Sequence, residues 1–212
     1  MDKPLKRNPW FSIWTKPRET IAEIVEFNPR YRFIVLSFIY GLPWMLQFSQ
    51  TFSLGTSWSM AFIVIICLIL AIPVGALAMS FTSLLLLWTG KLLKGGASFI
   101  QIRAAVSWTN VPNVVNIIAW IILLLFFQNL ILSRGFTMTS FVGFEKGLFI
   151  FLQLAMSVAG IWGLVIFLHA LGQVQGFSAW MALLNAILIA IILVVAGYAL
   201  AVLTNWLMFP GG

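Results

Sequence analysis

Five long apolar segments constrain this chain more than any other feature of its sequence. They cover residues 33–50, 60–90, 104–132, 147–172 and 180–209. The hydrocarbon core of a bilayer is about 30 Å thick, and an α-helix needs roughly 20 residues to cross it. The sequence therefore predicts an all-α, polytopic bundle of five transmembrane helices over residues 33–212, preceded by a separate N-terminal segment, 1–32.

The composition excludes an ordinary soluble protein. Hydrophobic residues make up 62% of the 212 positions and charged residues only 8%, whereas soluble domains carry about a quarter charged residues. So few charges cannot cover a surface in water, and lipid must surround most of the chain. The single cysteine, Cys67, lies inside an apolar run, which argues against a disulfide framework and a cysteine metal site.

The basic residues predict the orientation of the bundle. Seven of the twelve Lys and Arg lie in the first 32 residues, and the net charge is +7. Such juxtamembrane charge is typical of segments that face anionic lipid head groups, and it does not indicate a nucleic-acid partner. With five spans and the N-terminus inside, ten basic residues fall on the inner side and only Arg134 and Lys146 on the outer side. We expect a cytoplasmic N-terminus, a C-terminus on the opposite side, and a first span that stays in place as a signal anchor.

The second segment, 60–90, admits two interpretations. It has 31 residues with Pro73 and Gly75 near its middle, so it could be one kinked helix or a re-entrant pair. Each half of a pair would have about 14 residues, which is too short to span. A pair would also move Lys91, Lys94 and Arg103 away from the basic N-terminus, so we expect one helix.

The N-terminal segment contains a short amphipathic helix. Residues 17–27 follow two aromatic-rich turns, and a proline at the first helical position suits a helix start. Three- and four-residue spacing puts Ile21, Ile24 and Val25 on one face. With Trp10 and Trp14 before it, this pattern predicts an interfacial helix lying on the cytoplasmic leaflet. The alternative is a solvated tail.

Three motifs resemble one family. They are NPWFSIWTKPRET at residues 8–20, GGASFIQIRAAVSWTNVPNVV at 95–115, and HALGQVQGFSAWMALLNAI at 169–187. In this order they resemble bacterial members of the Yip family, relatives of eukaryotic membrane proteins named for interacting with Ypt/Rab GTPases. The resemblance implies a five-span fold, a bacterial cytoplasmic (inner) membrane and a trafficking-like adaptor role. Because bacteria have no Rab-driven vesicle traffic, the resemblance supports the fold of this chain more strongly than it supports the activity of the eukaryotic members.

Two loops share a Gly-x-Ser pattern. Gly96-Ala97-Ser98 precedes the third span and Gly176-Phe177-Ser178 the fifth, and Ser98 and Ser178 are candidate helix caps. In the five-span topology both loops face the cytoplasm, which predicts a parallel repeat of two hairpins. The alternative to a repeat is that the two loops are independent helix caps.

Small residues predict how the last two spans pack. Ala155, Ala159 and Gly163 share one face of the fourth span. Ala182, Ala186 and Ala190 share one face of the fifth. Because small faces allow close approach in lipid, we expect these two faces to meet.

Polar residues inside the spans are few. No Asp or Glu lies within them, although coupled transporters usually place ionisable residues there. The candidate polar intramembrane cluster is Asn110, Asn113, Asn116, His169 and Asn185. Pro112 removes a helical donor near the first three, so the asparagines would either join helices or line a polar cavity. His169 is either a pH-sensitive or lipid-contacting group, or an ordinary hydrogen-bonded side chain.

An enzyme is not indicated. The sequence has no HExxH motif and no paired carboxylates, and Trp180 replaces the last glycine of a G-x-S-x-G turn. We therefore expect no catalytic residue, no metal and no cofactor.

The hypothesis that fits best is a non-enzymatic, membrane-organising or protein-interaction factor that acts through its cytoplasmic face. Its expected partners are anionic lipid head groups and an unknown membrane or cytoplasmic protein. Homo-oligomerisation is left open as a further possibility. The alternative is a small permease or lipid-handling protein with a polar site in the bundle. The candidate lipid or partner contacts are Trp10, Trp14, Lys16, Arg18, Lys91, Lys94 and Arg103.

Overall fold

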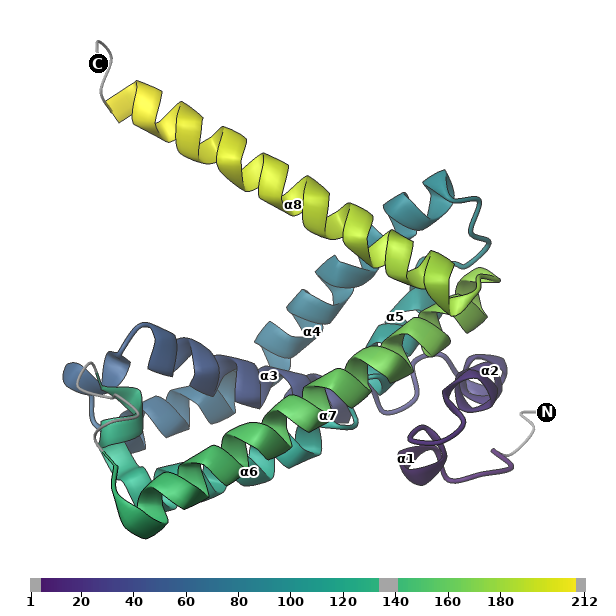
Figure 1. Cartoon of the computed structure of the whole chain (residues 1–212). Coiled ribbons are helices and arrows are strands. Elements are labelled where there is room, and N and C mark those ends of the chain that lie inside the picture. The colour runs from purple at the N-terminus through teal and green to yellow at the C-terminus, as the bar shows by residue number, and fades with distance from the viewer. Residues whose placement is uncertain (1–4, 134–140, 209–212) are drawn as a thin grey trace.

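The computed structural model describes residues 5–133 and 141–208, and within them every regular element is helical. In chain order the elements are α1 (Pro9–Ser12), α2 (Pro17–Phe27), α3 (Phe33–Thr51), η1 (Leu54–Thr56), α4 (Met60–Leu92), α5 (Phe99–Trp108), α6 (Asn113–Phe127), η2 (Gln128–Leu132), α7 (Gly143–Gln175) and α8 (Ala179–Met208) (Figure 1). Five helical segments of the described chain are long and apolar enough to cross a membrane, which confirms the predicted all-α class and its five spans. Lys3, Arg134 and the expected last span residue, Phe209, lie outside the described residues.

Helices α3 and α4 pack with their backbones in contact. A Cβ on Gly41 would overlap the carbonyl oxygen of Ala71, and a Cβ on Gly75 would overlap that of Ser37. The second apolar segment is one continuous helix with Pro73 inside it, so the re-entrant pair is excluded. Gly75 is needed for close approach of the two helices in lipid, not for a turn.

The third apolar segment is not one helix, and that prediction was wrong. Helix α5 ends at Trp108, and α6 begins at Asn113 after a turn that contains Pro112. Pro112 has no N–H to donate, and its ring clashes with the preceding helical turn. The chain therefore forms turn bonds, such as Asn113 N–H to the Asn110 carbonyl at 2.9 Å, before a new helix starts.

Helix α2 has the bounds that the sequence predicts, but its apolar face covers protein. Ile21 and Ile24 are fully buried and pack in one cluster with Trp108 of α5 and Ile166 of α7. The expectation that this face lies on the leaflet was wrong, because α5 and α7 offer it a complementary apolar surface. The short α1 and α2 sit at one end of the long helices (Figure 1).

Helix α8 packs against the bundle only near its start. Ala182 is buried in a cluster with Met79 and Leu86 of α4 and Leu171 of α7, whereas residues 190–202 are exposed. In Figure 1 the far half of α8 points away from the other helices.

The face of α7 that carries the small residues Ala155, Ala159 and Gly163 does not pack against α8. The nearest atom to a Cβ on Gly163 would be the carbonyl oxygen of Thr109, at 3.7 Å, while Ala155 and Ala159 line a groove with Val115 of α6. The predicted pairing of this face with the face of α8 that carries Ala182, Ala186 and Ala190 was therefore wrong, and Ala182 packs with Met79 and Leu171 instead. Small residues allow close approach, but they do not specify which helix approaches.

We predict that Gly75→Ala destabilises the bundle, because the new methyl group would meet the Ser37 carbonyl and force α3 and α4 apart. Overpacking of this kind costs about 1–3 kcal/mol. The matched control is Gly160→Ala in α7, where a Cβ meets nothing within 4 Å and helix propensity favours alanine. Thermal unfolding in detergent should show a lower midpoint for Gly75→Ala only. Equal midpoints for the two variants would contradict the backbone contact.

Candidate functional site

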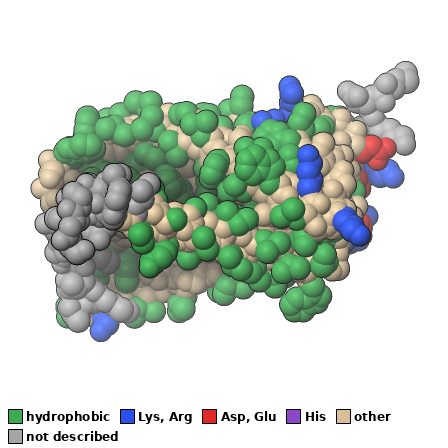
Figure 2. Space-filling view, turned by 90° about the horizontal axis from the view of Figure 1, so that it is seen from above, with side chains coloured by type: hydrophobic (Ala, Val, Ile, Leu, Met, Phe, Trp, Pro, Cys, Tyr) green, Lys and Arg blue, Asp and Glu red, His purple; other side chains and the backbone are tan. Residues whose placement is uncertain are grey.

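Charged residues gather at one end of the bundle. We call the surface formed by α1, α2 and the loops 93–98 and 176–178 the basic end. Figure 2 shows a face that is apolar over most of its length, with most of its Lys and Arg side chains, and its Glu side chains, at one end. The described cations of this end and its adjoining helix termini are Lys6, Arg7, Lys16, Arg18, Arg30, Arg32, Lys91, Lys94 and Arg103. The candidate contact residues predicted from sequence therefore belong to one part of the molecule.

The two Gly-x-Ser loops meet at Gln175, the last residue of α7. The Gly96 N–H donates to the Gln175 carbonyl at 3.3 Å. The Gln175 side chain is buried against Gly90 and Gly95, where any Cβ would overlap it. Its Nε2 donates to the Leu86 carbonyl at 3.2 Å. Gln175 thus joins the end of α7 to the end of α4.

Asn185 extends this junction to α8. It is fully buried, its Nδ2 donates to the same Leu86 carbonyl at 3.3 Å, and its Oδ1 accepts from the Thr89 hydroxyl. Because amide groups in a low-dielectric interior are costly when unpaired, these bonds fix the three helix ends relative to one another. Asn185 was expected in a polar cluster with the other asparagines, but its side-chain hydrogen bonds are to Leu86 and Thr89 of α4.

The N-terminal segment rests on these loops. An Nη of Arg18 donates to the Phe177 carbonyl at 3.2 Å, and Nε1 of Trp162 donates to the Trp14 carbonyl at 3.2 Å. Trp10 packs edge-on against Trp108, with ring centroids 5.4 Å apart. Trp10 and Trp14 are thus partly buried against protein, whereas sequence placed both in the lipid interface.

The cations of the basic end have different surroundings. Arg7 pairs with Glu19, and this bond lowers the pKa of the exposed Glu19 carboxyl. The Arg103 guanidinium lies over the rings of Phe33 and Phe99, 4.4 and 5.5 Å from their centroids. Burial, and then the like charge of Arg30, lower the pKa of Arg103.

Both loop serines lie at helix starts. The Met181 N–H donates to Oγ of Ser178 at 3.2 Å. The Ser98 N–H donates to Oε1 of Gln101 at 2.8 Å, which is the return bond of a capping box.

Three asparagines form a ladder beside the helix break. Nδ2 of Asn113 donates to Oδ1 of Asn110 at 3.1 Å, and Nδ2 of Asn116 donates to Oδ1 of Asn113 at 2.9 Å. At the other end, Nδ2 of Asn110 donates to the Val106 carbonyl at 2.7 Å. His169 is not in this ladder, because its Nδ1 bonds the Val165 carbonyl of its own helix at 2.9 Å.

A cavity of about 240 Å³ adjoins the ladder between α3 and α6. We call it the polar niche. Its lining includes Tyr40, Trp44, Gln47, Asn113, Asn116 and Trp120. Oδ1 of Asn116 and Nε1 of Trp120 are both buried without a hydrogen-bond partner. The ladder therefore ends in one unpaired acceptor, and an unpaired donor lies one helical turn away, both buried behind the lining of the niche.

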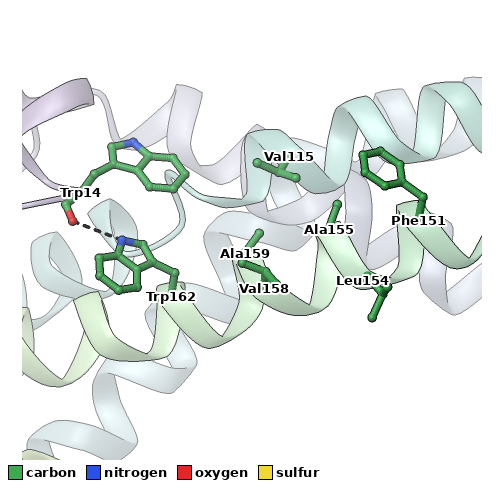
Figure 3. Close-up of a pocket in the computed structure, with 8 residues that line it drawn as sticks. All are labelled: Trp14, Val115, Phe151, Leu154, Ala155, Val158, Ala159 and Trp162. Carbon is green, nitrogen blue, oxygen red and sulfur yellow. Dashed lines mark hydrogen bonds between the residues drawn. The ribbon is translucent and has the colours of Figure 1, made fainter.

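A larger, apolar groove of about 630 Å³ runs along α7. Figure 3 shows Trp14 and Trp162 side by side at one end, and Val115 of α6 facing Ala155 and Ala159. Trp162 is 43% exposed. On a membrane-spanning helix such a groove accommodates hydrocarbon chains.

Gln175 and Thr89 were not singled out from the sequence, although they make the central junction. The sequence offers only two separate features: the glycines Gly90 and Gly95 after one apolar run, and Gln175 at the end of another. Nothing in a single sequence indicates that these positions come together. Within residues 5–133 and 141–208, no group of three His, Cys, Asp or Glu could hold a metal ion.

We predict that Gln175→Ala loosens the basic end, because it removes the bond to the Leu86 carbonyl and leaves a void beside Gly90 and Gly95. The loss should be about 1–3 kcal/mol of unfolding free energy. Gln173→Ala, an exposed glutamine two residues earlier, is the matched control and should change little. Hydrogen exchange at residues 86–98 would report the loosening, and equal protection in both variants would refute the junction.

Comparison with known proteins identifies the chain's family. The family model described as the Yip1 domain matches residues 11–202. No curated protein and no solved structure matches the chain. The matched region includes α2, all five membrane spans and both Gly-x-Ser loops. This chain belongs to the Yip family of integral membrane proteins.

Proposed function

We propose that this Yip-family protein is a non-enzymatic, membrane-organising or protein-interaction factor that acts through its basic end. The observation that carries the proposal is the joining of three separate stretches into one surface. Arg18 of α2 bonds the Phe177 carbonyl, and Gly96 bonds the Gln175 carbonyl. A partner that touches one of these stretches would meet the others as well. The Yip family is in general a non-enzymatic membrane protein family.

The chemistry of this surface supports two kinds of contact. Large apolar side chains stand exposed at the ends of the helices that reach the basic end: Phe11 (75%), Leu92 (76%) and Trp180 (80%). Aromatic side chains beside Lys and Arg favour the head-group layer, where anionic lipids supply negative charge. We propose anionic head groups and one protein partner as ligands of the basic end.

The same charges support a location and an orientation. Basic residues concentrate at one end of the described structure (Figure 2), and the positive-inside rule assigns such an end to the cytoplasm. We propose that the protein resides in a bacterial inner membrane with its N-terminus in the cytoplasm and its C-terminus on the opposite side.

A second candidate function is lipid handling or small-molecule permeation. The polar niche is the observation that favours it, because a functional midplane site needs polar groups inside the bundle. The adaptor proposal ranks first, since the described spans contain no buried carboxylate that could couple transport to an ion.

We predict that photo-crosslinking probes in living cells capture one recurring protein from several positions of the basic end. Suitable positions are Phe11, Ala22 and Ser98, which are all exposed. Ile21 and Ala97 are buried, so probes there would test folding instead. A probe at the exposed Val142, before α7 at the opposite end, is the control and should not capture that protein. Capture of lipid alone from all three positions would sink the adaptor proposal and favour the lipid-handling candidate.

A further inference from the structure

Gln153 is a polar side chain on the lipid-facing surface of α7. It is exposed, and α7 carries no Asp, Glu, Lys or Arg after Lys146. Gln153 lies seven residues beyond Lys146, or about 10 Å further along the helix axis. Within residues 5–133 and 141–208 its side-chain amide makes no hydrogen bond. Because acyl chains offer no hydrogen-bonding group, only another protein segment can pair this amide inside the membrane.

The residues around Gln153 follow a heptad pattern. We call the stripe that they form the outer seam, and it consists of Ile150, Gln153, Ser157, Gly160 and Leu164. Successive members are three and four residues apart alternately, which keeps them on one side of the helix. Those from Gln153 onward are exposed, and a Cβ on Gly160 would meet nothing within 4 Å. This is the spacing by which two helices of a left-handed pair contact each other.

The outer seam contains a hollow that fits a side chain of a facing helix. The hollow has a volume of about 330 Å³ and is lined by Phe149, Ile150, Gln153, Leu154 and Ser157. The last four of these are residues i, i+3, i+4 and i+7 of one helix. Four residues in this arrangement form the hole that receives one side chain of the neighbouring helix in a coiled coil. In a parallel pair, the side chain that enters this hole comes from the same heptad position as Gln153.

The facing helix does not come from the same chain. Helix α8 packs with α7 at Leu171, near the start of α8, and residues 190–202 of α8 are exposed. A second copy of the chain, inserted with the same orientation, carries its own Gln153 at the same depth. A glutamine amide both donates and accepts hydrogen bonds. Two Gln153 side chains are therefore complementary to each other across a two-fold axis.

We propose that two copies of this chain form a parallel dimer through the outer seams of their α7 helices. Gln153 of each copy enters the hollow of the other and bonds the other Gln153. Amide side chains join membrane helices in this way, and a polar residue at one position of a heptad repeat fixes the register of the pair. The two basic ends then lie on the same face of the membrane. The dimer does not depend on what the basic end binds, so it can fail or hold independently of the adaptor function.

Disulfide cross-linking of the full chain in native membranes tests the dimer. Cys67 is the single cysteine of the chain, so Cys67→Ala provides the background for one introduced cysteine. Ser157→Cys places it on the outer seam, and Leu164→Cys places it at the same heptad position one repeat later. Both variants should give a covalent homodimer on oxidation with copper phenanthroline. Val158→Cys is the matched control, because Val158 is also exposed and at nearly the same depth, but about 100° further round the helix. It should give little dimer.

Substitutions of Gln153 test the amide pair in the Ser157→Cys background. Gln153→Leu should weaken association about five-fold, as for the loss of an interhelical hydrogen bond, and so lower the yield of dimer. Gln153→Asn keeps an amide and should restore part of that yield. Gln153 and Ser157 are exposed in the single chain, so thermal unfolding in detergent should confirm that every variant is folded. Equal cross-linking of Ser157→Cys and Val158→Cys would overturn the proposal. So would a yield that Gln153→Leu leaves unchanged, or a cross-linked product that mass spectrometry identifies as a different protein.

Discussion

The absence of water in the bilayer core is the constraint on which this structure depends. A polar group in hydrocarbon must find its partner inside the protein. The clearest case is the Leu86 carbonyl, which accepts from both Gln175 and Asn185. These two amides come from different helices, so the position of α7 and α8 relative to α4 follows from the need to pair them. Apolar contacts alone would not fix these positions, because lipid chains are as apolar as leucine.

The same constraint explains what the sequence could predict. Length and hydropathy are sufficient for the number of spans, and proline and spacing are sufficient for the bounds of α2, because both depend on local chemistry. Pro112 was recognised as the loss of a helical donor, but not as a full break. The outcome depended on Thr109 and Asn110, whose side chains both donate to the freed Val106 carbonyl. Without such substitute donors, an unbroken but kinked helix would have cost less free energy than a full break.

Pairing between elements was beyond prediction for a different reason. An apolar face such as that of Ile21 and Ile24 is equally suited to lipid and to protein, so periodicity cannot identify its neighbour. Likewise, the small residues of α7 fit any helix that comes close, and the structure places the α5–α6 turn there rather than α8. Only the resemblance to a family could limit such alternatives, and it covers the fold without naming the contacts.

The break in the third span has structural consequences on both of its sides. On its α5 side it lets Trp108 reach the N-terminal segment, where Trp108 packs against Trp10 and Tyr31. On its α6 side it turns Asn116 and Trp120 toward α3 and leaves one acceptor and one donor unused. A continuous helix would need no asparagine ladder, because its own N–H groups would satisfy the carbonyls. The ladder therefore compensates for the break in the helix, but it leaves one buried acceptor, Oδ1 of Asn116, without a donor.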